Sequence, residues 1–264
     1  MKAKDFEFDG RNLSDFGFIL CNFGSKGLET LSNGANITFN TVSTLSGKKF
    51  ETASTQYEDC LSAIFQICKA SCNSDIEEIS DSEFRELTKW LSRHKFLKFK
   101  ILDEGHIDLY YEVKFDISRI EIDGCLYGLE LEALSNRPFA LKEKRKIIIE
   151  NTEPNGKHSI NDTSHEEGYI YPTVEIVVNE SGDLSIYNAI EDRTTLIKNC
   201  VAGEVITMDY PIILSSISSH NVQNDFNYIF FRIANSYNNS RNDLTISLPC
   251  TIKATYSPIV KVGL

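Results

Sequence analysis

The 264-residue sequence has no run of about 18 apolar residues, the length that a helix needs to cross a membrane, and its first residues (Met-Lys-Ala-Lys-Asp-Phe-Glu-Phe) lack the apolar core of a signal peptide. Positive charge is also scarce, because 27 lysines and arginines face 38 acidic residues, for a formal net charge of -11. Such a surface repels phosphate groups, which argues against ordinary nucleic-acid binding. We expect a chain that is made and kept in the cytosol, without membrane insertion, unless an assembly carries it out.

The motifs of common enzyme classes are missing as well. The chain has no Gly-rich phosphate loop, no His-Glu-x-x-His and no Gly-x-Ser-x-Gly. The adjacent acids Asp103/Glu104 and Glu166/Glu167 offer the two carboxylates of a glycosidase, but adjacent acids at turns are usually solvated. Five histidines lie apart from any candidate nucleophile and are interpreted as surface or hydrogen-bonded side chains: His94, His106, His158, His165 and His220. We predict no catalytic, cofactor-binding or metal site, and therefore no enzyme.

Cysteines are an odd and scattered set: Cys21, Cys60, Cys68, Cys72, Cys125, Cys200 and Cys250. Cys60, Cys68 and Cys72 invite a zinc interpretation, but no partner Cys-x-x-Cys or histidine pair lies near them in sequence. Most of the seven sit among apolar neighbours, as buried thiols do in a reducing compartment. We predict that none is bridged, so titration of the denatured, unreduced protein should find seven thiols.

Aromatic residues make up 11% of the chain, with 16 Phe, 11 Tyr and one Trp, a bias that favours strands. Alternating apolar residues predict strands in the first half over residues 6–8, 16–20, 37–39, 96–102, 110–122 and 126–133. Turn signals separate them at Asp9-Gly10, at residues 46–49, at residues 103–105 and at Asp123-Gly124.

Two helices are expected between these strands. Residues 57–70 carry Leu61, Ile64, Phe65 and Cys68 at helical spacing. The second helix has a clearer start, because Ser80-Asp81-Ser82-Glu83 matches a capping box in which Ser80 and Glu83 satisfy free backbone N–H groups.

The second predicted helix places Phe84, Leu87 and Leu91 on one face and is expected to end near His94. Trp90 lies beside this face, so core packing is preferred to the alternative that it stacks on a sugar. Strands, a helix and further strands predict an α+β first domain over residues 1–140.

Residues 141–168 are polar, apart from Ile147-Ile148-Ile149, and are interpreted as a linker with one strand. The basic run from Lys142 to Lys146 is interpreted as a solvated face rather than a DNA contact. Residues 169–264 show short alternating runs, which predict an antiparallel β-sandwich. These runs cover residues 174–178, 184–186, 206–210, 229–233, 244–248 and 252–256. As an alternative role, Tyr187, Tyr228 and Tyr237 would line a carbohydrate groove on this domain.

Several segments, in order, resemble the distal tail proteins of siphophages. In the first half these are Phe8-Asp9-Gly10 with Ser14-Asp15-Phe16-Gly17, Ser80 to Ser92, Tyr110-Tyr111-Glu112-Val113, Gly128-Leu129-Glu130-Leu131 and Arg137-Pro138-Phe139. In the second half, Tyr171-Pro172-Thr173, Gly182 to Asn188 and Gly203 to Asp209 resemble the family's galectin-like domain. Residues 57–72 depart from the family pattern, and the polar insert from Asn151 to Gly168 is long.

The resemblance implies a mainly β chain with an N-terminal β-sandwich carrying a helix, followed by a galectin-like antiparallel β-sandwich. It implies that the first domain forms a ring, a hexamer, which continues the tail tube of a phage or prophage, while the second faces outward. Tail tube protein and a tail-tip or tail-fibre protein would be the partners, and DNA would pass through the lumen without specific binding. A carbohydrate-binding module used in host adsorption is the alternative function, and a hydrolytic tail component is the third.

Overall fold

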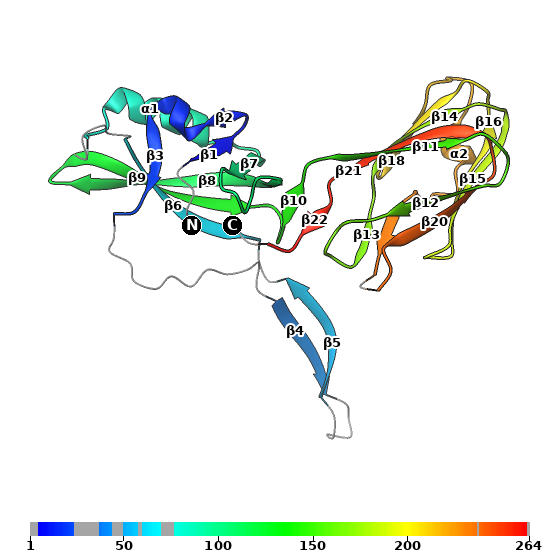
Figure 1. The fold of residues 1–264 in the computed structure, drawn as a ribbon, viewed down its shortest axis with the longest axis horizontal. Helices are drawn as coiled ribbons and strands as arrows, with labels where there is room; N and C mark the ends of the chain where they lie inside the picture. Colours follow the sequence, from blue (N-terminus) through cyan, green and yellow to red (C-terminus); the bar gives the residue numbers. More distant parts are fainter. Residues whose placement is uncertain are drawn as a thin grey trace. The chain divides into compact units, whose positions relative to one another are not determined.

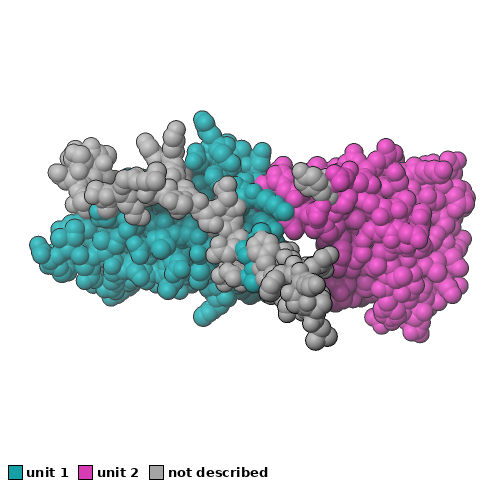
Figure 2. Space-filling view, turned by 90° about the horizontal axis from the view of Figure 1, so that it is seen from below, with its two compact units in different colours: residues 1–141, 261–264 teal, residues 142–260 magenta. Residues whose placement is uncertain are grey.

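The computed structural model describes residues 5–23, 37–43, 50–57, 60–69, 77–236 and 238–262. The chain divides into two compact units, which Figure 2 colours teal and magenta: residues 1–141 with 261–264 (unit 1) and residues 142–260 (unit 2). Antiparallel strands make up most of both units, so the prediction of a mainly β chain is confirmed. The turn expected at residues 46–49 lies outside the described residues.

Unit 1 is built on a large antiparallel sheet (Figure 1). Its strands are β1 (Phe6–Phe8), β2 (Arg11–Asn12), β3 (Phe18–Cys21), β6 (Ser62–Lys69), β7 (Leu97–Ile101), β8 (Leu109–Ile122) and β9 (Cys125–Ser135). Their order in the sheet is β2-β1-β7-β8-β9-β6-β3, with β10 (Ala140–Lys142) and β22 (Ile259–Val260) off this path. The predicted strands are confirmed, except that Phe16 belongs to a short 3-10 helix, η1 (Leu13–Phe16).

Two tight turns set the register of hairpins in this sheet. Asp9 and Gly10 both have positive φ, 52° and 74°, between β1 and β2, and Asp123 and Gly124 have 52° and 85° between β8 and β9. Two consecutive left-handed residues match the right-handed twist of the flanking strands, and Asp-Gly adopts them readily. Both turns were predicted from the sequence and are confirmed.

One helix, α1 (Asp81–Leu91), covers a face of this sheet (Figure 1). The predicted capping box is present: the Glu83 N–H donates to Ser80 Oγ at 3.4 Å, and the Ser80 N–H donates to Glu83 Oε2 at 2.8 Å. Leu87 and Leu91 are fully buried. The helix ends at Leu91, earlier than the expected end near His94.

Trp90 fixes α1 to the sheet. Its side chain is buried, its indole N–H donates to the Phe8 carbonyl oxygen at 3.1 Å, and its ring stacks on Phe6 and on Phe16. Core packing of Trp90 is therefore confirmed, and the sugar-stacking alternative is wrong.

The helix predicted over residues 57–70 is wrong. Tyr57 is the last residue of β5 (Phe50–Tyr57), which pairs with β4 (Ile37–Ser43) in a separate two-stranded sheet, and residues 62–69 form β6. β6 has apolar side chains on both faces, since Phe65 and Ile67 are buried in the core while Ile64 is 65% exposed on the other face. Apolar residues on two faces of a strand imitate helical spacing.

Unit 2 has two antiparallel sheets. The five-stranded sheet has the order β11 (Arg145–Asn151), β21 (Cys250–Tyr256), β14 (Thr173–Val178), β17 (Val205–Asp209) and β18 (Ile212–Ser215). The four-stranded sheet has the order β12 (Gly156–Asn161), β20 (Arg241–Ile246), β15 (Gly182–Asn188) and β16 (Arg193–Cys200). One apolar core takes side chains from both sheets, for example Val174 and Ile176 from the first and Ile186 and Leu244 from the second. The predicted antiparallel sandwich is confirmed.

Smaller elements complete unit 2. β13 (Gly168–Ile170) pairs with β19 (Ile233–Asn235), and a one-turn helix, α2 (Val222–Asp225), follows β18. The strand expected over residues 229–233 begins only at Ile233.

The interpretation of residues 141–168 as a linker with one strand is wrong. They contain β11, β12 and the start of β13, and they belong almost entirely to unit 2. β11 and β12 are each the outer strand of a sheet, and the outer face of such a strand is solvated and polar. Only a few of their side chains, such as Ile149 and Ile160, enter the core.

Candidate functional site

Unit 2 carries a continuous row of aromatic side chains in which each ring contacts the next. The rings come from β13 and the residues after it, from the turn between β17 and β18, and from the segment before β19. We call this set the aromatic row: Tyr169, Tyr171, Tyr210, Phe230, Phe226 and Tyr228.

The outer part of the aromatic row is held by an ion pair. Tyr169 meets Tyr171 edge to face at 5.5 Å, and Tyr171 stacks on Tyr210 at 4.1 Å with 7° between the ring planes. The Arg232 guanidinium lies 3.6 Å from the Tyr169 ring centre and binds both carboxylate oxygens of Glu191. Hydrogen bonding to Glu191 raises the pKa of Arg232, so the cation under Tyr169 stays charged and fixed.

The inner part of the aromatic row packs in the apolar core of unit 2. Tyr210 meets Phe230 edge to face at 5.3 Å, and Phe230 meets Phe226 at 4.8 Å. Both phenylalanines are buried core residues. Tyr169 and Tyr210 remain 55% exposed and Tyr228 68% exposed, so the row runs from the core to solvent.

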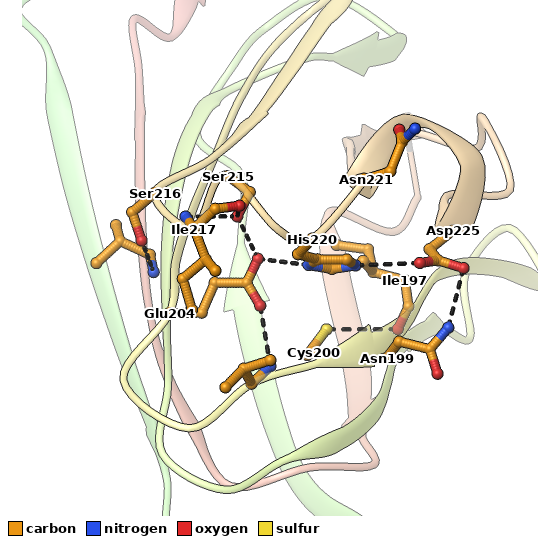
Figure 3. Close-up of polar contacts among 12 residues, drawn as sticks. Ile197, Asn199, Cys200, Glu204, Ser215, Ser216, Ile217, His220, Asn221 and Asp225 are labelled. Carbon is orange, nitrogen blue, oxygen red and sulfur yellow. Dashed lines mark hydrogen bonds and ion pairs between the residues drawn. The ribbon is translucent and has the colours of Figure 1, made fainter.

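A buried carboxylate–imidazole pair lies in the same unit (Figure 3). His220 Nδ1 is 2.6 Å from Glu204 Oε1, and His220 Nε2 is 3.4 Å from Asp225 Oδ2 in α2. The Ser215 hydroxyl donates to Glu204 Oε1 at 2.5 Å, and the Val201 N–H donates to Oε2 at 2.9 Å. The Glu204 side chain is fully buried and that of His220 is 4% exposed.

The electrostatics of this pair indicate a structural clamp. Burial by itself raises the pKa of Glu204, but hydrogen bonds from Ser215, His220 and Val201 outweigh it and hold this pKa below its ordinary value. Ser215 donates to Glu204, so the Ser215 hydroxyl is not placed for activation by His220 as a nucleophile. The pair ties α2 and β18 to the turn between β16 and β17, and His220 is the hydrogen-bonded histidine that the sequence suggested.

The acid pairs considered for glycoside hydrolysis lie at turns and in different units. Asp103 and Glu104 follow β7 in unit 1, whereas Glu166 and Glu167 precede β13 in unit 2; Glu104 and Glu167 are exposed. Among the remaining histidines, His158 contacts the buried Asn151 side chain at 3.0 Å, and His94 and His165 are exposed. The two acid pairs therefore belong to separate units.

Cysteines and metal ligands do not converge either. Over the described ranges, no group of three or more His, Cys, Asp or Glu side chains is placed to hold a metal ion. Cys60 is exposed and Cys68 lies on β6, while Cys72 is outside the described residues. The six described cysteines carry no disulfide.

Of the three tyrosines that the sequence suggested for a carbohydrate groove, one is found in the aromatic row. Tyr228 is part of the aromatic row, but the Tyr187 hydroxyl donates to Asp192 in the hairpin between β15 and β16, and Tyr237 lies outside the described residues. Tyr169, Tyr171 and Tyr210 were missed. Their one sequence signal is aromatic side chains beside turn residues, as in Gly168-Tyr169 and Tyr210-Pro211.

Unit 1 presents a second surface, the face of its sheet opposite α1, which we call the open face. The strand register places these charged side chains on it: Glu7, Lys98, Lys100, Glu112, Lys114, Asp116, Glu130 and Glu132. Asp116 and Glu132 are direct partners across β8 and β9, and both are exposed. Like charges directly opposite each other destabilise a sheet, so folding alone does not explain this pair.

Comparison with known proteins gives a family for each part of the chain. Residues 1–137 match the family described as phage tail protein N-terminal domain, and residues 139–256 match the family described as phage tail C-terminal domain. No curated protein matches the sequence. Neither α1 nor α2, the α-helices of the described part, has the length and apolarity to cross a membrane.

The fold is similar to that of a solved phage protein. The crystal structure of the phage SPP1 Dit protein (gp 19.1), a hub of the adsorption apparatus in phages that infect Gram-positive bacteria, matches with a TM-score of 0.67. The match covers 97% of this chain and 99% of that one at 10% sequence identity, so it is a likeness of fold. Together with the two family matches, it confirms the resemblance to distal tail proteins. The chain belongs to the phage tail protein family defined by these N- and C-terminal domains, and it has the Dit fold.

Proposed function

We propose that this chain is a structural, non-enzymatic protein of the phage tail tip. It forms a closed ring, a hexamer, at the distal end of the tail tube and joins the tube to the tail tip or baseplate and to the host-recognition parts. The observation that carries the proposal is the agreement of two phage tail families and of the Dit fold over nearly the whole chain. The protein is made in the host cytoplasm and resides in the virion, with tail tube protein and a tail-tip or tail-fibre protein as neighbours.

The open face of unit 1 supports a lumen role. A ring closes through heterologous contacts, in which one patch meets a different patch on the next subunit, and each subunit then turns one surface toward the axis. An open face with the acidic pair Asp116 and Glu132 at its centre repels DNA phosphates and lets DNA slide past. We assign the open face to the lumen.

Native mass spectrometry of the purified full chain tests the ring. We expect a closed species of six copies that persists on dilution, and a monomer at every concentration would refute ring formation. Incubation of the same sample with peptidoglycan and with polysaccharides should release no product. Robust turnover that disappears on mutating one carboxylate would refute the non-enzymatic role.

The lumen assignment is tested by reversing charge. Asp116→Lys with Glu132→Lys should give the ring a measurable, salt-sensitive affinity for DNA, because the changes place cations where phosphate passes. Reversal of two exposed acids of unit 2, Glu150→Lys with Glu180→Lys, changes the net charge equally and serves as the control. Equal DNA binding by both double variants would show that the open face does not line the lumen.

A second role, carbohydrate binding in host adsorption, is favoured by one observation. The aromatic row keeps three tyrosine rings exposed on a rigid base.

A further inference from the structure

We propose that the aromatic row of unit 2 is a binding surface for a neutral saccharide, with Tyr169 and Tyr210 as the rings on which sugar units stack. This inference extends the second role named above and does not depend on ring formation. It assigns a ligand class and contact residues to a surface outside the open face and the buried Glu204–His220 clamp.

The rings are ordered before any ligand arrives. Tyr169 is held between the Tyr171 edge and the Arg232 guanidinium, which is itself held by Glu191 and is only 17% exposed. Tyr210 is held between Tyr171, stacked at 4.1 Å, and the buried Phe230. Because little side-chain entropy is left to lose on binding, even weak contacts give a net gain in binding free energy.

Two exposed rings joined through Tyr171 offer more than one contact to a chain of sugar units. Two steps between ring centres, of 5.5 and 4.1 Å, separate Tyr169 from Tyr210. Both rings are more than half exposed, so one chain of sugar units can contact both. The apolar C–H faces of sugar rings pack against aromatic faces, while their hydroxyls need hydrogen-bond partners at the edges.

Polar groups for those hydroxyls flank the rings. Asp209 precedes Tyr210 and is exposed, with one carboxylate oxygen accepting from the Thr173 hydroxyl at 3.2 Å. Glu191 accepts from Arg232, whose guanidinium lies over the Tyr169 ring. A mostly aromatic surface with a few fixed polar groups is the usual composition of a small-ligand site.

Charge decides between ligand classes. Within the described part of the chain, Arg232 is the cation in contact with the aromatic row, and Glu191 matches its charge. Phosphate-rich or carboxylate-rich polymers would therefore meet an acidic protein of net charge -11 without a cation to receive them. A neutral, polyhydroxylated chain has no such penalty.

Saturation-transfer NMR on the full chain tests the proposal, with three neutral tetrasaccharides as probes, built from glucose, galactose and N-acetylglucosamine. At least one should bind with a dissociation constant of about 1 mM or tighter. Tyr210→Ala and Tyr169→Ala should each weaken binding at least tenfold, whereas Tyr210→Phe, which keeps the ring, should stay within about threefold. Circular dichroism confirms folding, and Tyr169→Ala keeps the test valid if Tyr210→Ala does not fold.

The matched control is Tyr187→Ala, because Tyr187 is a tyrosine of the same unit outside the row. It should leave binding unchanged. Absence of binding by all three probes at about 10 mM, or equal loss in Tyr187→Ala, overturns the proposal. Native mass measured on the same samples separates the two ideas, since a monomer that binds saccharide refutes the ring alone, and a ring that binds none refutes the saccharide surface alone.

Discussion

The two units solve the problem of burying a sheet in different ways. In unit 1 one large sheet is covered on one face by α1, and the opposite, open face carries exposed charges. In unit 2 two sheets share one core, and the buried Glu204 carboxylate in this unit is paired with His220. Unit 2 thus buries its apolar residues between its own two sheets, whereas unit 1 leaves one face of its large sheet with charged side chains, among them the exposed Asp116 and Glu132.

The difference indicates where assembly is encoded. A self-contained sandwich can be displayed on a particle without contributing to its closure. A like-charged pair on the open face of a sheet has a cost in folding free energy, which the proposed assembly would explain. The comparison therefore supports the proposal that unit 1 forms the ring and that unit 2 carries recognition.

Separating the units should have the largest effect. Residues 1–141 expressed alone should still form closed oligomers, at higher concentration than the full chain, and residues 142–260 alone should stay monomeric. Light scattering over a concentration series checks both. If the first piece folds yet remains monomeric while the second oligomerises, the roles of the two units are reversed.

Within unit 2, the buried contact between Glu204 and His220 should be the polar contact whose loss lowers the free energy of unfolding most. Glu204→Gln leaves His220 without its charged partner in the core, and we expect a loss of about 3 kcal/mol in the free energy of unfolding. Glu175→Gln, which removes an exposed pair with Lys253, is the matched control and should change stability little. Hydrogen exchange resolved by peptide should show the loss in residues 200–225 and leave unit 1 unaffected.

The clamp also predicts a pH dependence confined to unit 2. The pKa of Glu204 lies below the ordinary value of 4.5, so its contribution is fully present above that value and is lost as the pH falls through the lowered pKa. Acid should therefore loosen the segment around α2 below about pH 4.5, and Glu204→Gln should remove this part of the acid sensitivity. An unchanged acid profile in the variant would show that Glu204 is not the responsible group.

Much of the fold was predictable where one physical signal dominates. Three local signals agree with the observed structure: the capping box at Ser80 and Glu83, the Asp-Gly turns, and the alternation of apolar residues in β14 and β21. β6 was not predictable in this way, because it carries apolar side chains on both of its faces and so lacks the alternation of a half-buried strand. β11 and β12 were missed because outer strands look polar in sequence.

The candidate surfaces could be predicted only in part. Glu204 and His220 are joined by a turn and a strand pairing that no spacing rule encodes, and Asp225 joins them through α2. The aromatic row combines residues from 169 to 230, and only Tyr228 was anticipated. Side chains that meet through sheet pairing leave no periodic trace in the sequence.

The smallest expected effect concerns the N-terminal cap of α1. It tests whether this cap helps to hold the helix on the sheet of unit 1. Ser80→Ala removes the hydroxyl that accepts from the Glu83 N–H and donates to Glu83 Oε2 at 2.6 Å. The free energy of unfolding of unit 1 should therefore fall by about 1 kcal/mol. Ser92→Ala, at the other end of the helix, is the control and should be neutral. Trp90, the one tryptophan of the chain, stacks in this interface, so its fluorescence reports the unfolding of unit 1 alone.

The Ser80 hydroxyl also lowers the pKa of Glu83, so the stability lost in Ser80→Ala should shrink as the pH falls below about 4.5 and Glu83 takes up its proton in both proteins. A Ser80→Ala protein whose tryptophan transition matches the parent at neutral pH would mean that the sheet holds α1 in place without help from its cap.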